Sequence, residues 1–401
     1  MESALDSVKL PDTREDKLYR EWLKRLVWPK ILLGQRKQKI SKEVPRTNPL
    51  EPSIIFATLT NTYEGMTSLN IDKGVVQACA GFRDSAVRVW RLDNTYSDDN
   101  DWNMTEVLPK MKTSFVANKP KKRARTGVNM LEFHGHHKAV LGVCQDDTNR
   151  LLLSSSADES IRLWDLVVRQ CVAKYNCITP AWDVSFGPFG YYFASANIDR
   201  TVCVYSTDRV TPVRMMTGHV SDVTCCRWHD NGTYIISGSD DNTVRLWDIR
   251  TGSFVRVMKG SNSSISSVTI SPNGKYAASG NDKGILHIWD LASGSNLCIL
   301  EGHSTKHTIN SVAFSADNNA LSSGSSDCTV RIWDLLSSVE DAKNKAFSTK
   351  YSPVYHVGYT SHNVVYAGGP FVLPKKISAT ATSEIQAIAA LGLGVAMQQG
   401  I

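Results

Sequence analysis

Serine, histidine and aspartate occur together three times in this sequence, at nearly constant spacing. In each copy a serine lies ten residues and an aspartate six residues before a tryptophan, and a histidine lies 28 or 30 residues before it. These side chains are the components of a hydrolase triad, in which histidine takes the proton of a serine nucleophile and aspartate orients the histidine. The three sets are His136, Ser154, Asp158 and Trp164; His219, Ser237, Asp241 and Trp247; His303, Ser323, Asp327 and Trp333.

The recurrence of the set favours a structural role over catalysis. An active site is needed once in a molecule, whereas a structural contact is needed in every repeat. A hydrolase that uses one of the sets is the competing hypothesis, and it requires that mutation of Asp241 abolish turnover without melting the protein. The motifs for nucleotide binding, zinc proteolysis and serine hydrolysis are absent from the sequence. We therefore expect no enzyme activity, no catalytic residue, no cofactor, no metal site and no small-molecule substrate.

The three tryptophans belong to a longer internal repeat. Six copies of a short segment, such as SDDNTVRLWD, end at anchors spaced 74, 41, 42, 42 and 44 residues apart. A period of 40–45 residues ending in Trp-Asp is typical of WD repeats, in which each copy supplies one four-stranded blade of a propeller. Blades must stack in a ring, because one alone cannot bury both of its faces. The anchors are Trp90, Trp164, Tyr205, Trp247, Trp289 and Trp333.

The resemblance to WD-repeat proteins gives the recurring polar set a role. In those proteins tryptophan, serine, histidine and aspartate form a buried hydrogen-bond chain that ties the turns of a blade to its strands. We expect complete chains, or locks, in the second, fourth and sixth blades, where all four residue types are present. The other three numbered blades are depleted, either by drift or by release for partner contacts. The first blade has Ala80 in place of serine and keeps Asp84. The third has Cys177 in place of histidine and Tyr205 in place of tryptophan, and it keeps Ser195 and Asp199. The fifth has Ser261 in place of histidine and Lys283 in place of aspartate.

The two ends of the repeat region predict a seventh blade. Residues 353–373 offer three strands without a fourth, and residues 53–59 form a strand without a blade. Pairing the two would close the ring and cover an open sheet edge. The sequence therefore predicts an all-β, seven-bladed propeller over residues 53–373. A six-bladed ring with loose ends is the alternative.

Basic residues are concentrated outside the repeats. The net charge is +6, and the excess lies in residues 1–52 and in an insertion at 94–127 that is polar and expected to be disordered. Within the insertion, KPKKRAR is typical of a nuclear import signal recognised by importin. A merely solvated loop and a contact with nucleic acid or an acidic partner are the alternatives, and direct nucleic-acid binding is disfavoured because the repeats are nearly neutral. The cations of this segment are Lys119, Lys121, Lys122, Arg123 and Arg125.

The flanking segments lack export and membrane signals. Residues 14–33 place apolar side chains at helical spacing, which predicts an amphipathic helix within the extension 1–52. Residues 374–401 are rich in alanine and glycine and predict a flexible tail. No signal peptide and no apolar run long enough to span a membrane is present. The nine cysteines lack a CxxC pair, which favours buried thiols in a reducing compartment over disulfides or zinc.

Several segments are more specific than WD repeats in general. Residues 179–248 resemble the third and fourth blades of the WD-repeat subunit of the general transcription factor TFIID, its subunit five. The family's PxWD turn, GYYF strand, TD–P–R stretch and GHxxDVxCxxxH stretch occur here in order. Residues 56–71 and 81–90 resemble its first blade, and residues 347–371 resemble its closing blade. The matching segments are Pro180–Asp183, Gly190–Phe193, Thr207–Arg214 and Gly218–His229.

This resemblance implies a nuclear scaffold. The extension after His303 is similar to that of fungal members of the family. In fungi the subunit is shared between TFIID and the SAGA histone-acetyltransferase complex, and its propeller docks against histone-fold subunits. Family members carry a LisH motif and a helical domain before the propeller, whereas about 50 residues precede the first strand here, so we do not carry over the functions of that region. The alternative is another WD-repeat adaptor, such as a ubiquitin-ligase substrate receptor or a ribosome-assembly factor.

Overall fold

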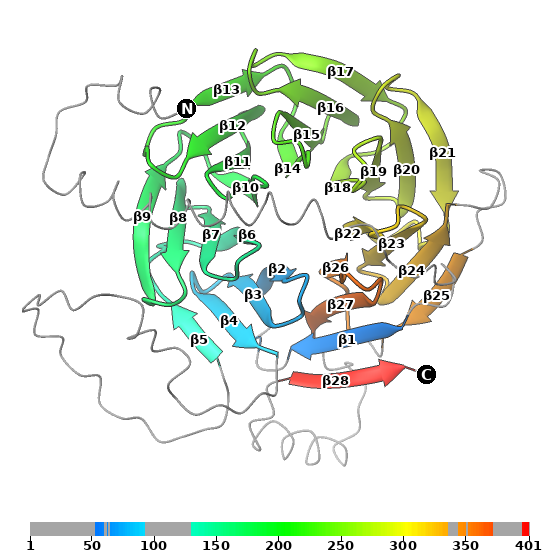
Figure 1. Ribbon diagram of the computed structural model, residues 1–401, viewed down its shortest axis with the longest axis horizontal. Helices are drawn as coiled ribbons and strands as arrows, with labels where there is room; N and C mark the ends of the chain where they lie inside the picture. The colour runs from blue at the N-terminus through cyan, green and yellow to red at the C-terminus, as the bar shows by residue number, and fades with distance from the viewer. Residues whose placement is uncertain are drawn as a thin grey trace, which may run out of the picture.

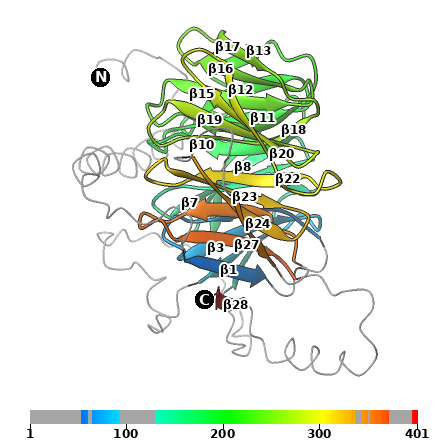
Figure 2. The same cartoon turned by 90° about the vertical axis from the view of Figure 1, so that its right-hand side faces the viewer.

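The computed structural model describes residues 53–59, 62, 65–92, 130–335, 344–349 and 352–371, together with the backbone of residues 395–400. All regular elements in these residues are β-strands, which form seven four-stranded sheets. Figure 1 shows the sheets arranged radially around a central axis, and Figure 2 shows the same ring edge-on. The predicted seven-bladed architecture is confirmed. Among the described residues no helix is long and apolar enough to cross a membrane.

The first six blades each use four consecutive antiparallel strands, numbered from the axis to the rim. In blade 1 the described strands β4 and β5 are separated by the long insertion that the sequence places there. Blades 1 to 3 are β2 (Met66–Ile71), β3 (Gln77–Phe82), β4 (Val87–Arg91), β5 (Met130–Phe133); β6 (Val140–Gln145), β7 (Leu151–Ser156), β8 (Ser160–Asp165), β9 (Gln170–Asn176); β10 (Ala181–Phe186), β11 (Tyr192–Asn197), β12 (Thr201–Ser206), β13 (Arg214–Thr217). Blades 4 to 6 are β14 (Val223–Trp228), β15 (Tyr234–Ser239), β16 (Thr243–Asp248), β17 (Phe254–Lys259); β18 (Ile265–Ile270), β19 (Tyr276–Asn281), β20 (Ile285–Asp290), β21 (Asn296–Glu301); β22 (Ile309–Phe314), β23 (Ala320–Ser325), β24 (Thr329–Asp334), β25 (Asn344–Ser348).

Burial within a blade is greatest in the second strand and least in the outer strand. The second strands β3, β7 and β23 are buried at every position, because neighbouring blades cover both of their faces. These strands use small residues, and Gly238 in β15 shows why: a Cβ there would lie 2.5 Å from Cγ2 of Ile265 in the next blade. The outer strand β17, in contrast, is mostly exposed. The core is therefore a series of layers between adjacent blades.

The closing blade combines both ends of the repeat region, as predicted, but in a different order. Its sheet runs β26 (His356–Tyr359), β27 (Val365–Pro370), β1 (Ile54–Leu59) and β28 (Val395–Gly400). Among the described residues, Pro370 ends β27 and does not begin a third C-terminal strand, and the amide of Phe371 donates to Leu59 O. Strand β1 therefore takes the third place, parallel to β27, rather than the fourth.

The outermost strand of the closing blade comes from the segment that the sequence assigns to a flexible tail. Strand β28 pairs antiparallel with β1 along its whole length, from Ile54 with Gly400 to Leu59 with Val395. The expected propeller boundary at residue 373 is thus wrong for residues 395–400, because β1 leaves an open edge that another strand can pair with. The remaining terminal and insertion predictions lie outside the described residues. These are the helix in 1–52, the basic insertion 94–127 with its import signal, and residues 374–394.

Candidate functional site

The four side chains of the blade 4 set form one continuous hydrogen-bond chain. The indole Nε1–H of Trp247 donates to Ser237 Oγ at 2.8 Å, and His219 Nε2 lies 2.8 Å from the same oxygen. His219 Nδ1 lies 2.9 Å from Asp241 Oδ2. Because Asp241 can only accept, His219 carries its proton on Nδ1 and accepts from the serine hydroxyl through Nε2. Strands β15 and β16 and the turn before β14 are thereby joined.

The structure brings together the corresponding residues of blades 2 and 6 in the same way. The serine oxygen accepts the indole N–H, one histidine nitrogen faces that serine, and the other faces the aspartate. The distances, in the order indole to serine, histidine to serine and histidine to aspartate, are 2.8, 2.7 and 3.1 Å for Trp164, Ser154, His136 and Asp158, and 3.0, 2.7 and 2.9 Å for Trp333, Ser323, His303 and Asp327.

The serine, histidine and aspartate contacts have the connectivity of a hydrolase triad, yet their surroundings prevent nucleophilic attack. Ser154, Ser237 and Ser323 are completely buried, so no substrate carbonyl can approach their oxygens. Each oxygen also accepts an indole N–H, a contact that the serine, histidine and aspartate of a hydrolase triad do not include. Burial and the added tryptophan distinguish these chains from a catalytic site.

The aspartate at the end of each chain also shapes the adjoining turn. Asp241 Oδ1 accepts from both the N–H and the Oγ1–H of Thr243, at 2.9 and 2.6 Å. The residue between them, Asn242, has a φ of 62°, a left-handed conformation that costs a non-glycine residue about 1–2 kcal/mol. The equivalent residues of the other numbered blades share this conformation, and they are Ser85, Glu159, Arg200, Gly284 and Cys328.

The carboxylates remain ionised in the folded protein. Burial alone would raise the pKa of Asp241, but hydrogen bonds from Thr243, His219 and the amide of Val220 outweigh it and lower the pKa to about 2. The same balance lowers the pKa of Asp158 and Asp327 below the usual range. The chains therefore end in a charged acceptor, which gives stronger hydrogen bonds than a neutral one.

We expect acidification to destabilise the fold in the range between pH 6.5 and about 4. Burial lowers the pKa of His136 and His219 from 6.5, and burial with the nearby Arg227 lowers the pKa of His356 to about 4. The unfolded chain thus binds protons near pH 6.5 that the folded chain excludes until the pH is lower, so stability is full above pH 6.5 and falls below it.

This pH dependence can be measured by urea unfolding at about pH 7 and about pH 4.5. The His356→Gln variant should lose less stability between these two conditions than the natural chain does. An unfolding midpoint that is the same at both pH values would contradict the expectation.

The depleted blades contain different contacts. In blade 3, Tyr205 OH donates to Cys177 Sγ at 3.4 Å, so the two replacements face each other where tryptophan and histidine would lie. The hydroxyl of Ser195 donates to Asn197 Oδ1. Among the described side chains, Asp199 accepts a hydrogen bond only from the hydroxyl of Thr201. In blade 3 a phenol–thiol contact therefore occupies the place of the Trp–Ser–His–Asp chain.

Blades 1 and 5 retain parts of the chain. In blade 5 the indole of Trp289 still donates to Ser279 Oγ at 2.8 Å, whereas Ser261 turns to Ser263 O and Lys283 offers no carboxylate. In blade 1, where Ala80 replaces the serine, Asp84 pairs with Arg88 at 2.6 Å. The complete chains thus occur in alternate blades, as the sequence indicates.

The cysteines form no disulfide in the structure. All nine are free, and four are buried within strands. The described residues contain no group of three or more histidine, cysteine, aspartate or glutamate side chains placed to hold a metal ion.

Exposed apolar side chains, which the sequence analysis missed, are concentrated on one side of the ring. Apart from Val168 and Phe371, every exposed large apolar side chain among the described residues lies between Ile178 and Ile299, in blades 3 to 5 or the turn leading into them. The sequence could not show this, because the same strand pattern predicts outward positions in every blade. On blade 3 the exposed group is Trp182, Phe189, Tyr192, Val210, Val213 and Met215.

Sequence comparison identifies the repeat. The family described as WD domain, G-beta repeat, matches residues 127–165, 169–206, 210–248, 252–290 and 294–334. Each match ends with the third strand of a blade and begins at or before the outer strand of the preceding one. One repeat is therefore shared between two blades, which links neighbours through the chain itself.

Several curated proteins are similar to parts of the chain. Transcription initiation factor TFIID subunit 5 of Caenorhabditis elegans is 35% identical over 25% of this chain and 16% of its own length, and that of Drosophila melanogaster is 32% identical over 43% of this chain and 23% of its own. The Ribosome biogenesis protein WDR12 homolog of Nematostella vectensis is 28% identical over 41% of this chain and 50% of its own.

The chain thus spans less than a quarter of the length of the TFIID subunits that it matches, and half of the length of the ribosome biogenesis protein. With seven four-stranded sheets closed into a ring and five matched repeats within it, the chain is a seven-bladed β-propeller built from WD40 repeats.

Proposed function

We propose that this protein is a non-enzymatic scaffold subunit of the RNA polymerase II transcription initiation machinery, of the TFIID type. The observation that carries the proposal is the similarity to TFIID subunit 5 from two animals and from Encephalitozoon cuniculi, at 32–35% identity. A rigid ring suits such a role, because it offers wide faces for several partners and needs no chemistry.

The exposed surface of blade 3 supports the proposal. The stretch that most resembles TFIID subunit five, residues 179–248, includes the apolar group on that blade, with Val210 and Phe189 each 52% exposed. Phe189 and Val210 lie in two turns at one end of the blade, which are joined by the hydrogen bond from the Thr207 amide to Tyr191 O. Exposed apolar side chains gathered in this way mark protein contacts. In our proposal the propeller docks histone-fold subunits of TFIID, and of the SAGA coactivator, in the nucleus.

Co-purification tests this assignment. A tagged full chain recovered from nuclear extract should carry TATA-binding-protein-associated histone-fold subunits, identified by mass spectrometry. We expect Val210→Glu to reduce their recovery at least about threefold, because a charge placed in an apolar contact is costly. Val168→Glu is the matched control, since Val168 is equally exposed on the neighbouring blade. Recovery of splicing or ubiquitin-ligase subunits in place of TFIID subunits would overturn the proposal.

A role in ribosome assembly is the second candidate. It is favoured by the ribosome biogenesis protein homologue, because this chain matches half of that protein's length, a larger share than for the TFIID relatives. The same co-purification separates the two, since pre-ribosomal particles would then be recovered without histone-fold subunits.

A further inference from the structure

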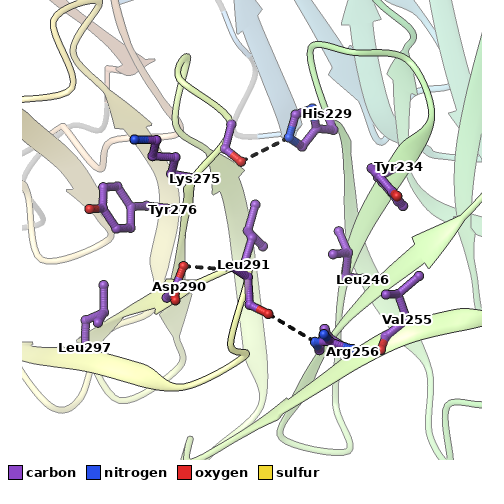
Figure 3. A pocket seen from close by; sticks show the side chains of 12 residues that line it. His229, Tyr234, Leu246, Val255, Arg256, Lys275, Tyr276, Asp290, Leu291 and Leu297 are labelled. Carbon is purple, nitrogen blue, oxygen red and sulfur yellow. Dashed lines mark hydrogen bonds between the residues drawn. The ribbon is translucent and has the colours of Figure 1, made fainter.

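A groove lies where blades 4 and 5 meet, away from the hydrogen-bond chains. It is open to solvent and has a volume of about 600 Å³, within the range of small ligand sites. Blade 4 contributes the turn after β14, strand β16 and the outer strand β17, and blade 5 contributes the turns before β19 and after β20 (Figure 3).

Two hydrogen bonds between the blades fix the groove's two ends. His229 Nδ1 accepts from the amide of Asn231 at 3.1 Å, so Nε2 carries the proton and donates to Gly274 O at 3.2 Å. At the other end, Arg256 Nε donates to Ala292 O at 3.3 Å. Figure 3 shows both bonds, with Leu246 and Leu291 between them. The groove is thus a preformed feature of the joint between two blades.

Apolar side chains form the floor of the groove and part of its edge. Leu246 and Leu291 are buried at its base, whereas Val255 and Leu297 on the outer strands are 39% and 43% exposed. Two tyrosines, Tyr234 and Tyr276, also line it. Such a lining favours aliphatic side chains of a partner over water.

The charged side chains at the groove differ in how far their polar atoms are already hydrogen-bonded within the protein. The carboxylate of Asp290 accepts from the amides of Ala292 and Ser293 and from Ser293 Oγ, and these bonds lower its pKa. Lys275 and Arg256 are exposed, and neither forms an ion pair with a described carboxylate. Arg256 donates only to the backbone oxygens of Ala292 and Val255. Two cations therefore face an occupant, beside one ionised carboxylate whose oxygens are already hydrogen-bonded by its own turn.

From this arrangement we propose that the groove binds a short peptide segment of a partner protein that presents aspartate or glutamate beside leucine-type side chains. The aliphatic side chains contact Leu246 and Leu291, and the carboxylates contact Lys275 and Arg256. Peptide recognition commonly combines an apolar anchor with a few charged contacts that fix orientation. The inference depends on the groove alone and not on which assembly the protein joins.

Fluorescence anisotropy of the full chain tests the proposal. The probe is a fluorescein-labelled peptide in which aspartates flank a run of leucines, with a second peptide that carries lysines in their place. The natural chain should bind the aspartate peptide at least about tenfold more tightly. The Arg256→Glu, Lys275→Glu double variant should reverse this preference, because the charges that face the peptide change sign. A damaged fold cannot produce a reversed preference, so the result is independent of any loss of stability.

A matched control separates the groove from the net charge of the protein. Lys138 and Lys306 are exposed in turns of blades 2 and 6, outside the groove, and their double replacement by glutamate changes the net charge by the same amount. That variant should keep the natural preference. Equal binding of both peptides by the natural chain, or an unchanged preference in the Arg256→Glu, Lys275→Glu variant, would overturn the proposal.

Discussion

Replacing Trp247 by alanine should lower the free energy of unfolding by about 3–5 kcal/mol, the range for a large aromatic side chain removed from a core. Trp247 is fully buried and packs in the layer between blades 3 and 4 with Val204 and Met216. Its indole N–H also donates to Ser237. The substitution therefore opens a cavity between two blades and removes the first donor of the hydrogen-bond chain. Urea unfolding followed by far-ultraviolet circular dichroism measures the loss.

The control for this experiment is Trp182→Ala. Trp182 is 41% exposed, so its removal should cost less than about 1 kcal/mol. Similar losses for the two variants would contradict a core role for Trp247. The comparison uses the same chemical change in neighbouring blades and measures the combined effect of burial and of the indole hydrogen bond.

Replacing Asp241 by alanine should lower the free energy of unfolding by about 2–3 kcal/mol, because its loss leaves buried partners without an acceptor. Asp241 accepts from His219 Nδ1, from the amides of Val220 and Thr243, and from Thr243 Oγ1. The left-handed turn residue Asn242 also loses the contacts that hold its conformation. A thermal or urea unfolding midpoint is the measurement.

Asp240→Ala provides the adjacent control. Asp240 is exposed, and burial together with the neighbouring carboxylates of Asp222 and Asp282 raises its pKa. Its removal should relieve repulsion and leave stability unchanged or slightly higher. The pair also tests the hydrolase hypothesis: a variant of Asp241 that keeps its full stability and loses a hydrolytic activity would overturn the structural role.

The sequence predicted most of the ring, because the information is local and repeated. The spacing of Trp164, Trp247 and Trp333 sets the blade length, and the polar residues at constant offsets from them are the ones that meet in the structure. Strands of one blade are consecutive in the chain, so a period of about 42 residues is sufficient to order them. The recurrence of the set distinguished a structural contact from a triad before any geometry was known.

The closing blade could be predicted only in part. The need to cover an open edge indicated that both ends of the repeat region share a sheet. Which strand takes which place depends on pairing between residues about 310 positions apart, such as Ile54 with Val365. Backbone groups have no sequence signature, so neither the parallel pairing of β1 nor the addition of β28 could be inferred from residue types.

The residues alone thus determined the fold class, the number of blades and which blades contain complete Trp–Ser–His–Asp chains, because each of these depends on a pattern inside one repeat. Only the tertiary structure decided that Ser237 and its two equivalents are inaccessible, that exposed apolar side chains gather on blades 3 to 5, and that a groove opens between blades 4 and 5. These properties depend on how one blade covers its neighbour. His229 and Gly274 meet across that joint although 45 residues separate them, and no spacing within a repeat encodes such a contact.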